Sequence, residues 1–165
     1  MSDYNSNENN YNTQPDMPMK WHKFLIYFGL WLGAIGGIGN GIMLLTGAHY
    51  TQQGGSPEMV YSRFPGLKTV DVLFAIIYIG VAIWAIYTRF QLAEYKAGAP
   101  GKLLALYIMS FAMGIIYAIV GAGVIHVSVS TVLSGSSIIG SIVGTIVAVV
   151  INNIYYGKRA HLFYH

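Results

Sequence analysis

The feature that most constrains the fold of this chain is a run without any Lys, Arg, Asp or Glu from residue 103 to residue 157. As a single helix, these 55 residues would extend about 80 Å at a rise of about 1.5 Å per residue, whereas the hydrocarbon core of a bilayer is about 30 Å thick. The chain must therefore turn within the run. Helix-breaking residues gather at 128–137 (SVSTVLSGSS), which leaves two predicted membrane spans at about 103–127 and 137–156.

Two earlier apolar runs predict two more spans. Residues 24–46 carry no charge, and neither do residues 72–88, which extend to about 70–89 to reach the length that a bilayer requires. The first run is too long for the apolar region of a cleaved signal peptide. With 55% hydrophobic and only 9% charged residues, the chain does not have the composition of a water-soluble protein. We therefore expect an all-α, integral membrane four-helix bundle formed by residues 20–165.

Outside the spans, the sequence predicts one tail and one sizeable loop. Residues 1–19 are rich in Asn and have little to bury, so we expect a disordered cytoplasmic tail. In the loop after Gly47, Ser56 can cap a helix and Pro57 suits its first position. A short helix on the outer membrane surface is the favoured interpretation, and an irregular loop remains the alternative.

The basic residues predict the topology. Seven of the nine Lys and Arg fall on one side of a four-span arrangement, at positions 20, 23, 89, 96, 102, 158 and 159, and two fall on the other, at 63 and 68. Because cytoplasmic loops carry the excess of Lys and Arg, both termini should be cytoplasmic, most simply in a cell membrane. The same residues are scattered at span ends rather than clustered on one element, so no nucleic-acid partner is expected.

Small residues recur every four positions in three of the spans. Close approach of backbones drives helix association in lipid, and such stripes form grooves that permit it. The helix-packing residues that we predict are Gly29, Gly33, Gly37 and Gly41 in the first span, Gly114 and Ala118 in the third, and Gly140 and Gly144 in the fourth. The second span carries the bulkier Tyr78 and Trp84 and should pack on the outside.

No catalytic motif stands out. The chain has no cysteine, and no carboxylate falls within its uncharged runs, although a small proton antiporter would need one. Ser110 and His126 lie 16 residues, or roughly 24 Å, apart on one predicted helix and cannot form a dyad. We therefore expect no enzyme, no catalytic residue, no cofactor and no metal.

One polar constellation remains at the outer face. His49 and His126 end spans of the same direction, so they could meet there and form, with Glu58 or Asp71, a metal or proton-sensing site. Two independent interfacial histidines are the favoured alternative, since the four residues show no motif spacing. At the inner end of the fourth span, headgroups and water are expected to satisfy Asn152 and Asn153.

The span boundaries resemble a known group of proteins. PMKWHKFLIYF at 18–28 and NNIYYGKRAHLF at 152–163 are similar to the boundaries of uncharacterised small four-span membrane proteins of Gram-positive gut bacteria. The resemblance implies a bacterial cytoplasmic membrane and brings no activity or site residue.

Two functions fit the sequence. The favoured one is a non-enzymatic interaction or regulatory subunit, embedded in the lipid bilayer and packed against another membrane protein or a second copy of itself. The alternative is a subunit of a small channel or transporter, with Asn40, Tyr117 and the serines of the third and fourth spans lining a path.

Overall fold

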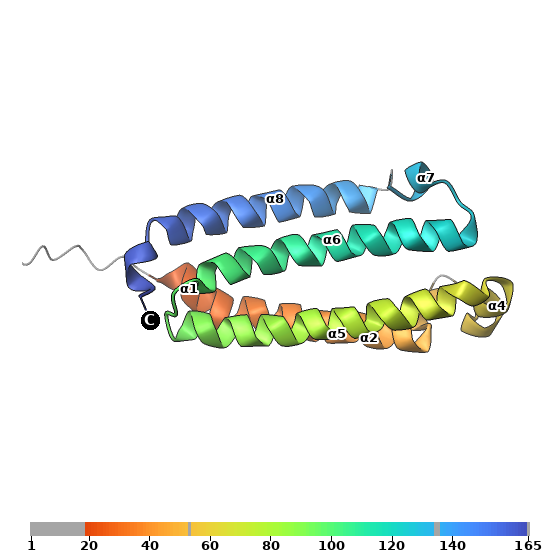
Figure 1. Ribbon diagram of the computed structural model, residues 1–165, viewed down its shortest axis with the longest axis horizontal. Helices are drawn as coiled ribbons and strands as arrows, with labels where there is room; N and C mark the ends of the chain where they lie inside the picture. The colour runs from red at the N-terminus through yellow and green to blue at the C-terminus, as the bar shows by residue number, and fades with distance from the viewer. Residues whose placement is uncertain (1–18, 53, 134–135, 165) are drawn as a thin grey trace, which may run out of the picture.

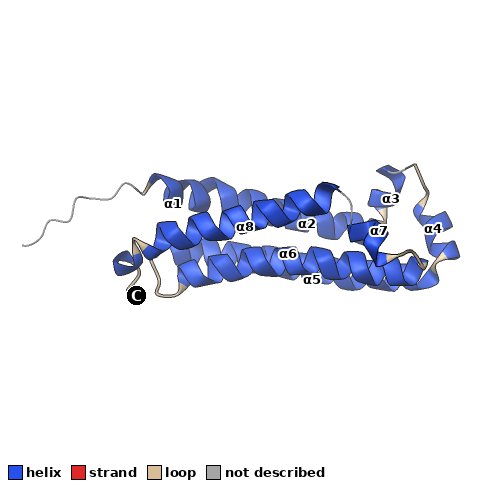
Figure 2. Ribbon diagram, turned by 90° about the horizontal axis from the view of Figure 1, so that it is seen from above, coloured by secondary structure: helices blue, strands red, loops and turns tan. Residues whose placement is uncertain are grey.

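The computed structural model describes residues 19–52, 54–133 and 136–164, and this part of the chain is helical without a β-strand. Four of its helical stretches are long and apolar enough to cross a membrane: Lys20–Thr46, Pro65–Ala93, Ala99–Ile125 and Ile138–Gly157. They run side by side as an elongated bundle (Figures 1 and 2). The all-α architecture with four apolar helices is thus as predicted, while the predicted tail at 1–18 lies outside the described residues.

The first span is not a uniform α-helix, although it contains no proline. It consists of α1 (Lys20–Phe24), a π-helical turn η1 (Leu25–Gly29) and α2 (Leu30–Thr46). A π turn widens the helix and exposes its carbonyl groups to outside donors. One such donor is present, because Arg89 Nε donates to the carbonyl of Ile26 at 3.0 Å.

Short helices form one end of the molecule, between the first and second spans. α2 ends at Gly47, whose positive φ of 70° suits glycine, and α3 (Ala48–Gln52) follows. α4 (Pro57–Arg63) begins where the Ser56 hydroxyl accepts the Met59 N–H at 3.2 Å. The chain then enters α5 (Pro65–Ala93). Pro65 thus starts a long helix, as a proline at the first helical position can.

The second half of the chain is a long hairpin. α6 (Ala99–Ile125) begins after Gly98 and ends at His126, which has a left-handed φ of 56°. α7 (Val129–Leu133) lies in the predicted turn, and α8 (Ser136–Gly157) runs back to the end of the bundle where α1 lies (Figure 1). The short 3₁₀ helix η2 (Ala160–Leu162) follows it there, close to the C-terminus in Figure 1.

The packing order of the helices differs from our expectation for the second span. α2 packs along α5, α5 along α6, and α6 along α8, so α5 has a neighbour on each side instead of lying outside the bundle. A Cβ added at Gly37 would lie 3.1 Å from the Cβ of Ala82, and one at Gly41 would lie 3.1 Å from the carbonyl oxygen of Ala75. Ala75 and Ala82 are small residues on the face of α5 toward α2, so the glycine groove of α2 can approach this face closely.

Candidate functional site

A carboxylate lies inside the second span, which corrects the expectation that no span holds one. Asp71 is the seventh residue of α5 and is completely buried. A charge that has lost water is costly unless hydrogen bonds or an opposite charge replace the lost hydration. Its surroundings therefore have to supply donors.

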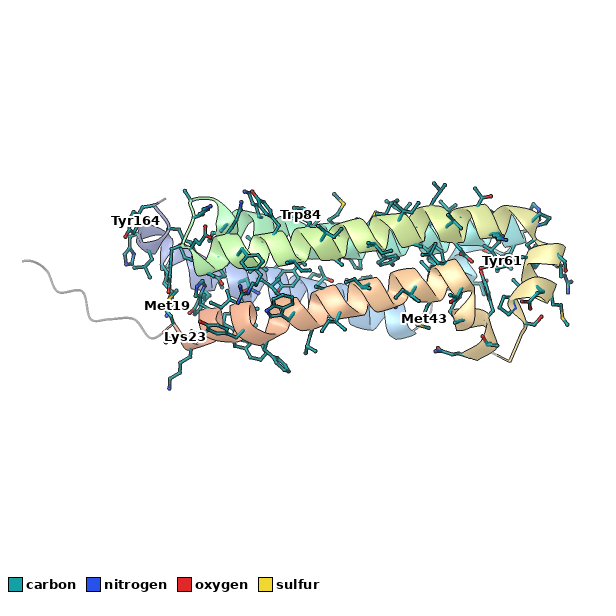
Figure 3. The ribbon with its side chains drawn as sticks, turned by 90° about the horizontal axis from the view of Figure 1, so that it is seen from below. Met19, Lys23, Met43, Tyr61, Trp84 and Tyr164 are labelled. Carbon is teal, nitrogen blue, oxygen red and sulfur yellow. The ribbon has the colours of Figure 1, made fainter. Side chains whose placement is uncertain are left out.

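Three tyrosines supply these donors, each from a different helix. Tyr50 of α3 and Tyr61 of α4 each donate to Oδ2 of Asp71 at 2.9 Å, and Tyr117 of α6 donates to Oδ1 at 2.8 Å. Hydrogen bonds to an ionised acceptor are about twice as strong as neutral ones. One side chain of α5 thus holds three other elements at the end of the bundle opposite Lys23, where Figure 3 places Tyr61.

His49 completes the group that we call the Asp71 cluster (Asp71, Tyr50, Tyr61, Tyr117 and His49). His49 Nδ1 lies 3.2 Å from the carbonyl oxygen of Met43, which can only accept, so Nδ1 carries the proton in the neutral ring. Nε2 is buried without a hydrogen-bond partner and lies 3.9 Å from Oδ2 of Asp71. The unpartnered Nε2 therefore faces the carboxylate.

The tyrosines of α3 and α4 are held as neutral donors. Burial raises the pKa of Tyr50 well above the ordinary tyrosine range, and the hydrogen bond to Asp71 adds to the increase. The pKa of Tyr61 rises for the same two reasons, burial first. Because a phenolate beside a carboxylate would be repelled, both hydroxyls remain protonated at neutral pH.

The structure brings together two of the four outer-face residues that the sequence singles out. His49 and Asp71 meet, whereas Glu58 is exposed in the first turn of α4 and His126 is exposed at the end of α6. Within the described part of the chain, no three His, Cys, Asp or Glu side chains converge as a metal site would need. The sequence does not predict that the three tyrosines bind Asp71, because they lie 10, 21 and 46 residues from it without a common motif.

A second polar layer lies at the opposite end and fastens α1 to α8. Trp21 Nε1 donates to Asn152 Oδ1 at 3.0 Å, and His22 Nδ1 lies 3.1 Å from the hydroxyl of Tyr156. Asn152 is only 1% exposed, so protein atoms rather than headgroups satisfy it, while Asn153 is exposed as expected. His22 is completely buried against the rings of Tyr95, Tyr156 and Phe163.

The predicted helix-packing residues divide into contacting and open positions. In the first span, Gly37 and Gly41 contact α5, whereas a Cβ at Gly29 would meet side chains of its own segment and one at Gly33 would meet no atom within 4 Å. The positions in the third and fourth spans do not contact each other closely. A cavity of about 490 Å³ separates α6 from α8, lined by Gly114, Ala118 and Gly144 with several hydroxyl residues, and Gly140 faces open space.

The residues expected to line a path are dispersed. Tyr117 is bound to Asp71, and Asn40 is exposed on α2. Ser110 and Ser141 lie at the cavity between α6 and α8, together with Thr145.

The comparisons with known proteins add no family to these observations. No protein-family model, curated protein or solved structure matches this chain.

Proposed function

We propose that this protein is a non-enzymatic interaction or regulatory subunit, and that α8 binds a transmembrane helix of another membrane protein. One observation carries the proposal: α8 packs along a single long helix, α6, and exposes large apolar side chains along its length. These side chains are Ile139, Ile142, Val143, Ile146, Val147, Val150, Ile151 and Ile154.

The chemistry of α8 favours a helix over lipid tails as the occupant of this surface. Apolar side chains gain little by leaving lipid for one another, so association depends on close backbone approach and hydrogen bonds. Gly140 and Gly144 are exposed with open space above them, which permits close approach. Thr145 has a hydroxyl group at the neighbouring cavity, and an acyl chain offers no hydrogen-bond partner for this hydroxyl.

Photo-crosslinking in native membranes tests this proposal. A photoreactive residue at Val143 of α8 should capture one defined membrane protein, and Gly144→Leu should abolish the capture while leaving the melting temperature unchanged. Gly80→Leu is the matched control, because Gly80 is exposed on α5 and also faces open space. Equal capture in both leucine variants would show that α8 does not recognise a helix.

The channel or transporter alternative is supported by a different observation, the buried carboxylate in α5. Ionisable groups within membrane spans frequently serve proton or ion pathways. Under this alternative, the protein reconstituted in vesicles should carry protons or K⁺, and Asp71→Asn should abolish the flux. Vesicles with full protein content and no flux would exclude it.

We also propose that the protein lies in a bacterial cell membrane, with both termini in the cytoplasm and α4 on the outer surface. The support is electrostatic and compositional. Arg63 and Lys68 are the basic residues near the α4 end, whereas the other seven lie toward the opposite end, where Figure 3 places Lys23. Met59 of α4 is 69% exposed, as expected for a side chain that enters a lipid surface.

A further inference from the structure

We propose that Arg89 and the three rings around it bind the phosphate of an anionic lipid, in the leaflet at the Lys20 end of the bundle. We call this group the Arg89 site; it consists of Arg89, Tyr27, Trp31 and Phe90. The inference is independent of the proposed function, because it concerns the lipid-facing surface between the first span and α5 and not α8.

The π turn of the first span fixes the guanidinium group in place. Arg89 Nε donates to the carbonyl oxygen of Ile26, which lies within η1, at 3.0 Å. This bond uses one of the five N–H donors of the side chain, and no other hydrogen bond joins Arg89 to a described residue. The half-buried arginine therefore keeps its two Nη groups available for an external acceptor.

Three aromatic rings border the same guanidinium. Its Cζ lies 4.8 Å from the ring centroid of Phe90, 5.5 Å from that of Trp31 and 6.0 Å from that of Tyr27. All three rings are exposed on the surface that would face lipid. Rings at these distances stabilise the cation without consuming its N–H groups, so the planar fork can still bind two phosphate oxygens.

The depth of Arg89 matches that of lipid phosphates. α5 has 29 residues, or about 43 Å, which equals the thickness of a bilayer with its headgroups, about 40–45 Å. Arg89 lies four residues before the end of this helix at Ala93, or about 6 Å from it. The guanidinium is therefore expected at the boundary between hydrocarbon and headgroups, where Trp and Tyr also accumulate.

The surrounding charge favours an anionic over a zwitterionic lipid. The same end carries Lys20, Lys23, Lys102, Lys158 and Arg159. Of the described acidic residues, only Glu94 lies at this end, and it is paired with Lys96 at 2.8 Å. A positive field of this kind attracts headgroups whose phosphate has no cation of its own.

Quenching of Trp31 by brominated lipids tests the proposal in the full-length chain. Vesicles contain one-fifth brominated phosphatidylglycerol or one-fifth brominated phosphatidylcholine in unlabelled phosphatidylcholine. The Trp31 contribution is obtained as the difference between the wild-type chain and its Trp31→Phe variant. We expect this contribution to be quenched at least about twofold more by the phosphatidylglycerol, as charge-assisted binding of one lipid requires.

The variants separate a defined site from general attraction. Arg89→Gln should equalise the two lipids, and Arg89→Lys should retain part of the preference. The exposed Lys23→Gln removes one of several surrounding charges and should retain most of it. Inorganic phosphate added to phosphatidylcholine vesicles should leave Trp31 fluorescence unchanged, which distinguishes a lipid from a free anion. Equal quenching by both lipids in the wild-type chain would overturn the proposal whether or not the variants fold, and so would a preference abolished by Lys23→Gln.

Discussion

At the scale of single residues, Asp71 determines how α3 and α4 are held against the bundle. Three phenolic hydroxyls from α3, α4 and α6 converge on one buried carboxylate, which therefore acts as the common acceptor of these helices. The unpartnered Nε2 of His49 lies 3.9 Å from Oδ2 of the same carboxylate and completes the cluster.

Removal of this acceptor should release the hairpin formed by α3 and α4. Asp71→Ala leaves three tyrosine hydroxyls without their acceptor, and an unsatisfied buried group costs about 1–3 kcal/mol, so we expect a loss of about 3 kcal/mol or more. Thermal unfolding in detergent measures the loss, and trypsin cleavage after Arg63 should accelerate. Glu58→Ala, which removes an exposed carboxylate from the same hairpin, should change neither quantity. If both variants are cleaved at the same rate, the cluster does not hold the hairpin.

The tyrosines of the cluster also predict a pH dependence. Because the pKa of Tyr50 and of Tyr61 is raised in the folded protein, the unfolded chain loses these protons first, near pH 10. Stability from this source is complete below about pH 10 and is lost as the pH rises further. Melting temperatures from pH 8 to pH 11 should fall above pH 10, and the double variant Tyr50→Phe with Tyr61→Phe should show a shallower fall. An unchanged slope in the double variant would contradict this origin.

At the scale of elements, the glycine stripe of the first span contains positions that contact α5 and positions that face open space. Leucine at Gly37 would force a side chain against Ala82, where a Cβ alone already approaches to 3.1 Å, and overpacking of this kind costs about 1–3 kcal/mol. Leucine at Gly33 would enter open space. We therefore expect Gly37→Leu to lower the melting temperature of the detergent-solubilised monomer and Gly33→Leu to leave it unchanged. Equal melting of the two variants would show that the α2–α5 contact is not tight.

The attachment of α8 to α1 is tested by two neighbouring asparagines. Asn152→Leu removes the hydrogen bond from the indole N–H of the exposed Trp21, at an expected cost of about 0.5–1.5 kcal/mol. Asn153→Leu changes an exposed position and should be neutral. Thermal unfolding of the two variants side by side measures the difference, and a greater loss for Asn153→Leu would refute the polar clamp.

Whether a feature of the structure could be predicted from the sequence depends on the range of the interactions that form it. The four spans could be predicted because apolar runs, their lengths and the charges at their ends are local properties, and Ser56 and Pro57 mark the start of α4 in the same way. Contacts between distant segments could not be predicted from the sequence. Neither the convergence of three tyrosines on Asp71 nor the central position of α5 leaves a spacing pattern in one sequence. The π turn at 25–29 was not predicted either, because no proline marks it.

At the scale of the whole molecule, polar clusters fasten the bundle at both ends. The Asp71 cluster joins α3, α4, α5 and α6 at one end, and the contacts of Trp21 and His22 join α1 to α8 at the other. Between them, α8 has α6 as its one long neighbour, with a cavity on the side toward it. If α8 binds a partner helix as proposed, the polar contacts at both ends of the bundle can stay in place.

The orientation of this bundle is the property on which both proposals about its surroundings depend, and it can be tested directly. Seven basic residues on one side against two on the other predict that both termini and the loop between α5 and α6 are cytoplasmic. A reporter active only in the cytoplasm should therefore be active when fused after Tyr95, and one active only outside should be active when fused after Gln53. The reverse pattern of reporter activity would place the Asp71 cluster in the cytoplasm and the Arg89 site in the outer leaflet.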